Sequence, residues 1–196
     1  MKPYSVISVR PQCPLKDYTM SINILAFTIA TLGVMAGNSS DSGTMPVDNE
    51  HFLIYGEIIE MDPVAAQERD AYGTQVIVYQ DGEIYVSFNA DEKGEYKFNL
   101  PVNHNYSVVY GGEDFVNKEI LIDAHKLPKN KYGQNVQLDL GLLKDFEGVD
   151  YSFLNAPVAL ISYDELAGEL SYDKKHYKKQ SKAMYKCMRE ILKMHG

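Results

Sequence analysis

The stretch ADEKGEYKFNLP, residues 90–101, joins a polar turn to an alternating strand and ends on a proline. Gly94 closes the turn, because glycine adopts a positive φ at little cost. Three apolar residues then alternate with polar ones, which places their side chains on one face of a strand, and Pro101 cannot continue the ladder. We interpret these residues as a fold signature rather than a catalytic set. The signature consists of Asp91, Gly94, Tyr96, Phe98, Leu100 and Pro101.

Residues 51–143 repeat this pattern of short period-two runs bounded by turn residues. Asp81 and Gly82 separate two such runs and favour a hairpin, since both residues tolerate positive φ. Gly56 interrupts the first run, and we expect a bulge or a close approach of another backbone there. The chain is predicted to be mainly β, a seven-stranded antiparallel β-sandwich followed by a C-terminal α-helix. The expected strands are 52–59, 74–80, 83–89, the one in the opening stretch, 106–111, 115–123 and 135–143.

The one long apolar run, INILAFTIATLGVMA at residues 22–36, is shorter than a membrane span, which needs roughly 20 residues. Small residues stand at the −3 and −1 positions of a cut after Ala36, so we predict a signal peptide over residues 1–36. A flexible linker is expected over 37–50. The protein is therefore expected to be exported to the periplasm or cell envelope. An uncleaved anchor, a buried helix and initiation at Met20 remain open.

The chain is acidic, with a formal net charge of −8, but its C-terminal end is basic. Residues 171–196 contain eight Lys/Arg against two Asp/Glu, which indicates a solvated helix face, a contact with the acidic body, or an anionic partner. We expect an extended segment over 144–172 and a basic amphipathic helix over 173–194. The apolar stripe of this helix is expected to pack on the sandwich in its first half and to be exposed in its second. Its candidate interaction residues are Tyr177, Met184, Met188 and Ile191.

Within residues 52–194, the segments GEIIEMD, TQVIVYQDGE, ADEKGEYKFNLPVNHNYSVVYGG and FVNKEILID follow one another. This order resembles the carboxypeptidase regulatory-like domain, a transthyretin-like sandwich of seven strands. The later segments LDLGLLKDFEGVDYSFLNAPVALISYD and YDKKHYKKQ are similar to the tail of a Bacteroidetes envelope group that carries this sandwich. The resemblance implies an accessory or envelope module, linked with surface, gliding or outer-membrane machinery. It provides no catalytic residues.

Motifs for catalysis are absent from the sequence, which has no HExxH, GxSxG, Walker loop or dinucleotide fingerprint. No His has a Glu three residues on, as a carboxypeptidase zinc site would require. Asp123 and His125 could share one face of a strand, but two ligands are too few for a metal site, so we expect structural or solvent-facing roles. Cys13 and Cys187 form no disulfide framework and no CxxC motif. We predict that the chain is not an enzyme and holds no cofactor.

The predicted function is a non-catalytic cell-envelope module with a structural or protein-interaction role. We expect another envelope protein as partner, and the negative net charge argues against nucleic acid. Peripheral membrane contact through the basic helix remains open, as does the oligomeric state. The alternative is a carbohydrate-binding module using exposed tyrosines, although such residues more often build a sandwich core. The aromatic set is Tyr79, Tyr85, Phe88, Tyr96, Phe98, Tyr106 and Tyr110.

Overall fold

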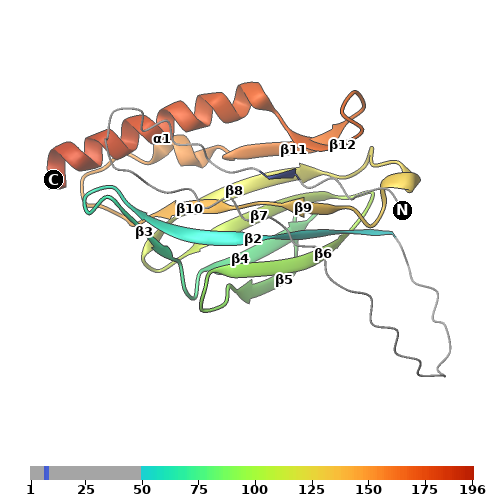
Figure 1. The fold of residues 1–196 in the computed structure, drawn as a ribbon, viewed down its shortest axis with the longest axis horizontal. Helices are drawn as coiled ribbons and strands as arrows, with labels where there is room; N and C mark the ends of the chain where they lie inside the picture. Colours follow the sequence, from blue (N-terminus) through green and yellow to red (C-terminus); the bar gives the residue numbers. More distant parts are fainter. Residues whose placement is uncertain (1–6, 9–49) are drawn as a thin grey trace, which may run out of the picture. The chain divides into compact units, whose positions relative to one another are not determined.

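A computed structural model describes residues 7–8 and 50–196 of the chain (Figure 1). The predicted cleavage site, the apolar run before it and the linker up to residue 49 lie outside the described residues, so the signal peptide stays a prediction. In the described part, the chain forms two β-sheets and one α-helix.

The first sheet is organised around the long strand β2 (His51–Asp62). It pairs antiparallel with β3 and β6, and in parallel with β9 and β10. The two-residue strand β1 adds to β9 in parallel. These partner strands are β1 (Ile7–Ser8), β3 (Gln67–Asp70), β6 (Glu95–Pro101), β9 (Asn135–Gln137) and β10 (Leu140–Leu143).

The second sheet has the strand order β12-β11-β8-β7-β4-β5. All of its neighbours are antiparallel except β8 and β11, which run in parallel. Its strands are β4 (Gln75–Gln80), β5 (Glu83–Asn89), β7 (Asn105–Gly112), β8 (Phe115–Asp123), β11 (Ala159–Asp164) and β12 (Glu169–Tyr172). Two short 3-10 helices, η1 (Lys129–Lys131) and η2 (Ser152–Asn155), lie in the connections.

A mainly β sandwich followed by a C-terminal helix is confirmed, but the predicted number of strands is wrong. Eleven strands, β2 to β12, lie between His51 and Tyr172, where the sequence predicts seven. The prediction of a purely antiparallel sandwich is also wrong, because β2 and β8 each have parallel neighbours. The segment 144–172 is more than an extended tail, since β11 and β12 extend the second sheet.

The two sheets face each other across one apolar core, to which the opening stretch contributes four side chains, that of Ala90 and three on β6. Tyr96, Phe98 and Leu100 are buried along β6. The Tyr96 hydroxyl donates to the backbone oxygen of Leu138 at 2.5 Å, so the Tyr110 hydroxyl, 3.1 Å away, is left to donate to Tyr96. Buried tyrosines normally need such partners, and here the pair joins a strand of each sheet.

Two glycines are required by the close packing of the first sheet. Gly94 has φ 75°, and a Cβ there would lie 2.2 Å from the backbone oxygen of Ile58. At Gly56 a Cβ would lie 2.1 Å from the backbone oxygen of Leu138, which is the close approach expected from the sequence. The turn before β6 is further fixed by Asp91, whose carboxylate accepts from the backbone N–H groups of Lys93 and Glu95.

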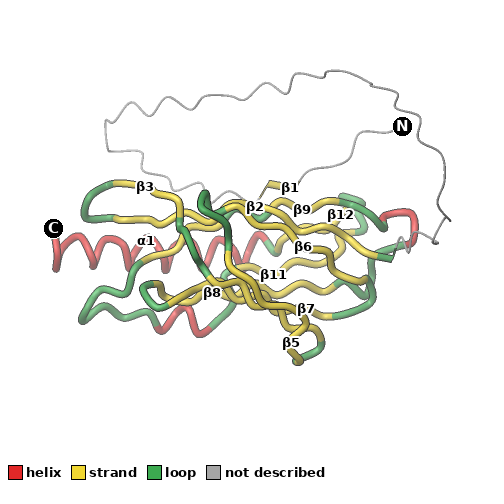
Figure 2. The backbone as a smooth tube through the Cα atoms, turned by 90° about the horizontal axis from the view of Figure 1, so that it is seen from below, coloured by secondary structure: helices red, strands yellow, loops and turns green. Residues whose placement is uncertain are grey.

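The helix α1 (Lys174–His195) follows β12 and extends along the sandwich to the C-terminus (Figure 2). Asp173 caps it, accepting from the backbone N–H groups of Lys175 and His176 at 2.8 and 2.9 Å. A second apolar cluster, which we call the seam, fixes the helix to the sandwich. Its buried members are Leu143, Cys187 and Ile191, and packed against them are Met61, Phe146, Val149, Tyr151, Phe153, Met184 and Met188.

Candidate functional site

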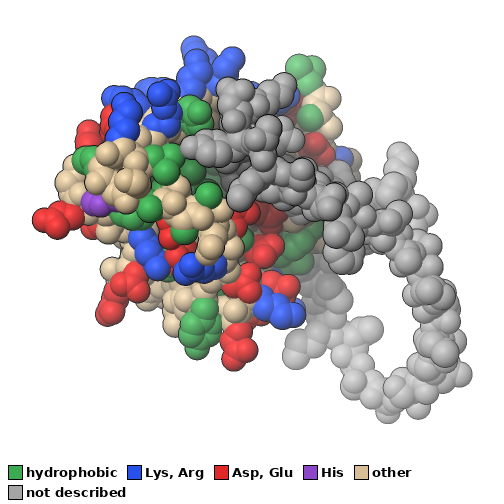
Figure 3. Space-filling model, turned by 60° about the vertical axis from the view of Figure 1, so that its left-hand side comes forward, with side chains coloured by type: hydrophobic (Ala, Val, Ile, Leu, Met, Phe, Trp, Pro, Cys, Tyr) green, Lys and Arg blue, Asp and Glu red, His purple; other side chains and the backbone are tan. Residues whose placement is uncertain are grey.

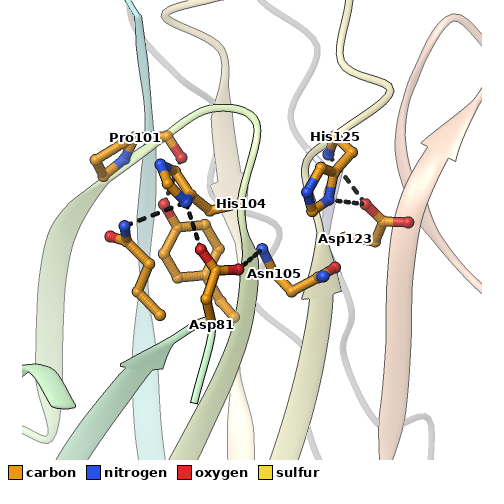
Figure 4. A network of polar contacts seen from close by, with 8 residues as sticks. Asp81, Pro101, His104, Asn105, Asp123 and His125 are labelled. Atoms are coloured by element: carbon orange, nitrogen blue, oxygen red, sulfur yellow. Dashed lines mark hydrogen bonds and ion pairs between the residues drawn. The ribbon is translucent and has the colours of Figure 1, made fainter. Parts of the chain in front are cut away.

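Three connections meet at one end of the sandwich and form a polar platform (Figure 4). They are the β4–β5 turn with Asp81, the β6–β7 connection, which ends at His104 just before β7, and the segment that follows β8 from Ala124 on. Backbone bonds join them, since Asp81 N donates to Asn105 O at 2.9 Å and Ala124 N donates to His104 O at 3.0 Å. The platform therefore holds its side chains on connected backbone rather than on separate loops.

The first pair on this platform is Asp81 with His104. The ring Nδ1 of His104 lies 2.6 Å from Asp81 Oδ2, and Asp81 Oδ1 accepts from Asn105 N at 3.0 Å. The hydrogen bond from His104, followed by the one from Asn105, lowers the pKa of Asp81 below its usual value. The hairpin prediction is confirmed at this position, because Asp81 and Gly82 have φ values of 50° and 92°.

The second pair is Asp123 with His125, the two residues that the sequence suggested as co-ligands. The backbone N–H and the ring Nδ1 of His125 contact Asp123 Oδ1 at 3.0 and 3.1 Å, and the first of these contacts lowers the pKa of Asp123 most. The histidine thus contacts the carboxylate directly, and the two side chains are not arranged as two ligands of one metal ion. Across residues 50–196, no three His, Cys, Asp or Glu side chains are placed to hold a metal ion together.

The aromatic residues proposed as a sugar-stacking set lie mostly in the core. Tyr96, Tyr106 and Tyr110 are buried, and burial is the main reason that the pKa of each hydroxyl is raised. Tyr106 donates to the backbone oxygen of Pro101, at the edge of the platform. Tyr85 is 44% exposed on the edge strand β5. The three buried tyrosines cannot offer a stacking face to a sugar, which weakens the carbohydrate-binding alternative.

The candidate interaction residues of the helix do not form an open stripe. Ile191 is fully buried, and Met184 and Met188 pack into the seam, so the exposure expected for the second half of the stripe is wrong at Ile191. The physical reason is that β10 ends in the buried Leu143, which needs an apolar cover. Tyr177 is half-buried and contacts Tyr172, with ring centroids 5.0 Å apart.

The opposite face of α1 carries a line of exposed cations, which we call the basic row. All of its side chains are exposed, and Lys and Arg gather over this part of the molecule in Figure 3. Lys186 Nζ lies 3.7 Å from Glu190 Oε1, which is the one ion pair that the described residues show for the row. Sequence reasoning noted these charges but missed that they form a line. The row consists of Lys175, Lys178, Lys182, Lys186, Arg189 and Lys193.

Sequence reasoning also missed the buried lysine of the sandwich. Lys118 is 5% exposed, and its Nζ donates to the backbone oxygen of Gly141 in β10. The sequence does contain a signal for its burial. Lys118 lies two and four residues before Ile120 and Ile122, so all three side chains point to the same face of the strand.

In residues 50–196, no helix has both the length and the apolar character to span a membrane.

Comparisons with known proteins leave the family of the chain unassigned. No family model and no curated protein matches it. Among solved structures, 3-chlorocatechol 1,2-dioxygenase from Rhodococcus opacus matches with TM-score 0.35 and 11% identity over 50% of this chain, and the match spans 62% of that protein. Catechol 1,2-dioxygenase from Acinetobacter matches with TM-score 0.36 and 14% identity over 56% of this chain and 57% of its own. The TIE protein of Bacillus anthracis gives TM-score 0.34 and 21% identity over 47% of this chain and 17% of its own. Likenesses this weak support no conclusion about activity.

Proposed function

We propose that the chain is a non-catalytic module of the cell envelope with a structural or protein-interaction role. The observation that carries the proposal is the way in which α1 is held. Its apolar stripe of Met184, Cys187, Met188 and Ile191 packs into the seam, while its basic row is exposed on the outer side of the same helix. A helix that served only to cover the sandwich would not need six cations in one line, because like charges on neighbouring turns repel each other.

The envelope assignment is supported by the resemblance to the carboxypeptidase regulatory-like domain and by the apolar run before Ala36. The interaction role is supported by the contrast of charge within the chain. Residues 50–170 hold eight Lys/Arg against twenty-two Asp/Glu, a formal charge of −14, whereas residues 171–196 carry +6. Charge separated in this way favours selective association with a partner of matching potential.

The test is cross-linking of the tagged full-length chain in its own cells, followed by fractionation. We expect the chain in the envelope fraction, cross-linked in constant proportion to a small number of envelope proteins. Recovery of the chain outside the envelope, or as an uncross-linked monomer at every cross-linker concentration, would contradict the proposal. A turnover of substrate by the purified chain would contradict its non-catalytic part.

A further inference from the structure

We infer that the basic row of α1 docks an acidic polypeptide segment of a partner protein. The inference rests on the proposed function and names the surface and the chemistry of the partner. The row follows the helix at spacings of three, four, four, three and four residues, from Lys175 to Lys193. At 1.5 Å per residue it spans about 27 Å, with neighbouring cations about 5 Å apart along the axis. Carboxylates along one side of a peptide have a comparable spacing.

The basic row is held in place before any partner binds. The seam fixes the inner face of α1, and Asp173 caps its first turn. Near the N-terminal end, His176 Nε2 contacts the backbone oxygen of Pro157 at 2.6 Å. At the other end, His195 Nε2 contacts the backbone oxygen of Glu147 at 3.2 Å. Because the helix is already ordered, a partner does not have to order it on binding.

Most cations of the basic row form no ion pair with carboxylates of the described residues. Asp173 is engaged as the helix cap, and Glu190 faces Lys186. Outside the helix, the carboxylate of Asp150 attracts Lys186 through space, but none of the described sandwich residues forms an ion pair with the row. A partner carboxylate would therefore meet cations that, Lys186 apart, form no ion pair within the described residues.

An anionic membrane surface fits the observations less well than a polypeptide. Interfacial helices bind by inserting an apolar face, and here Cys187, Met188 and Ile191 are occupied by the seam. A bilayer is also a broad surface, so it would bring its negative charge toward the acidic sandwich of residues 50–170 as well. An acidic polypeptide segment can contact the basic row without approaching the acidic sandwich. The same repulsion argues against nucleic acid.

The experiment uses the full chain and two triple variants with equal changes of charge. The row variant is Lys175→Glu, Lys178→Glu and Lys182→Glu, where glutamate keeps a high helix propensity and suits the N-terminal half of the helix. The matched control is Lys93→Glu, Lys126→Glu and Lys129→Glu, which are exposed positions outside α1. Circular dichroism and thermal melting establish that both variants fold.

The probe is a fluorescent peptide of about twelve residues in which Glu alternates with Ser, long enough to follow the row when extended. Its neutral counterpart has Gln in place of Glu. We expect the wild type to bind the acidic peptide but not the neutral one, and the row variant to bind about tenfold more weakly than the wild type, as charge reversal replaces attraction by repulsion. The control variant should stay within about twofold, and added salt should weaken binding.

Three outcomes would overturn the inference. The first is equal peptide affinity for the row variant and the control variant. The second is binding to vesicles with about one third anionic phosphatidylglycerol that the row variant loses while the peptide is not bound, which would indicate a membrane. The third is salt-dependent self-association that the row variant abolishes, which would place the acidic sandwich of a second copy on the row. If the envelope cross-links persist in the row variant, the proposed function stands and only the inference fails.

Discussion

The buried amine of Lys118 gives the protein a pH-dependent stability that one substitution should remove. Lys118 lies on β8, and its Nζ donates to the backbone oxygen of Gly141. Burial lowers the pKa of Lys118 from 10.5 to about 7, because surroundings of low dielectric constant disfavour the charged amine. In the unfolded chain the amine is in water and remains protonated up to its ordinary pKa.

The sign of the effect follows from the proton balance. Between about pH 7 and pH 10.5 the unfolded chain binds more protons at Lys118 than the folded chain, so the free energy of unfolding rises with pH in this window. The cost of burying the amine is absent above the window and fully present below it. One proton corresponds to about 1.4 kcal/mol per pH unit, so Lys118 should contribute an increase of about 2 kcal/mol between pH 7 and pH 9.

Lys118→Met removes the amine and keeps a side chain of similar length. At pH 7 the relieved cost is about 4 kcal/mol, and the lost hydrogen bond and imperfect packing offset part of it. We expect the variant to be about 2 kcal/mol more stable than the wild type at pH 7, and the difference to vanish near pH 9. Lys97→Met, at an exposed position of β6, is the matched control.

The assay is guanidinium-induced unfolding at pH 7, 8 and 9, followed by circular dichroism. The wild type and the control variant should show the same rise in stability with pH, and the Lys118 variant a smaller one. Parallel pH profiles for all three proteins would refute the presence of a proton-releasing buried amine. A Lys118→Met variant that is less stable than the wild type at pH 7 would show that the hydrogen bond outweighs the burial cost.

Three further substitutions, one of them with a matched control, test the packing of the sandwich and of the seam by thermal and denaturant unfolding. Gly94→Val should cost at least about 2 kcal/mol, because it combines a positive φ with a contact against backbone, and unchanged melting would show that the turn is not as described. Ile191→Ala should cost about 3 kcal/mol by opening the seam, while Met194→Ala, at a residue 51% exposed, should stay within about 0.5 kcal/mol. Tyr96→Phe should cost about 1–2 kcal/mol, since the Leu138 carbonyl loses its hydroxyl donor, and an unaltered stability would indicate that this bond contributes nothing net.

The sequence predicted those parts of the fold that alternate apolar and polar residues. In β6 the core residues Tyr96, Phe98 and Leu100 alternate with exposed ones, so the sequence alone assigns its faces. Strand β3 has no such signal, because every residue from Gln67 to Asp70 is exposed and the strand exists through its pairing with β2. Periodicity reports burial, so a short strand whose residues are all exposed, such as β3, leaves no period to read.

Parallel pairing was the second feature that the sequence did not indicate. The strand β11 pairs with β8, whose residues lie about forty positions earlier in the chain, so no local turn marks the contact. The prediction of one continuous strand over 135–143 is also wrong, because contacts with distant residues divide it into two strands. The segment runs along β2 as β9 and then β10, interrupted where Leu138 N donates to Tyr55 O and its carbonyl accepts from Tyr96. Local patterns identify strands, but which strands pair depends on the packing of the whole core.

The helix illustrates how one periodic pattern leaves two functional interpretations open until the packing is known. From the sequence, the stripe of Met184, Met188 and Ile191 was as plausible an interaction surface as the cations opposite it. In the structure the apolar stripe packs into the seam, a cluster with three buried members that is separate from the main core of the sandwich. A ligand that binds the basic row only when the helix is docked should stabilise that docking by mass action. For such a ligand, binding at the row and packing at the seam are coupled through the same helix.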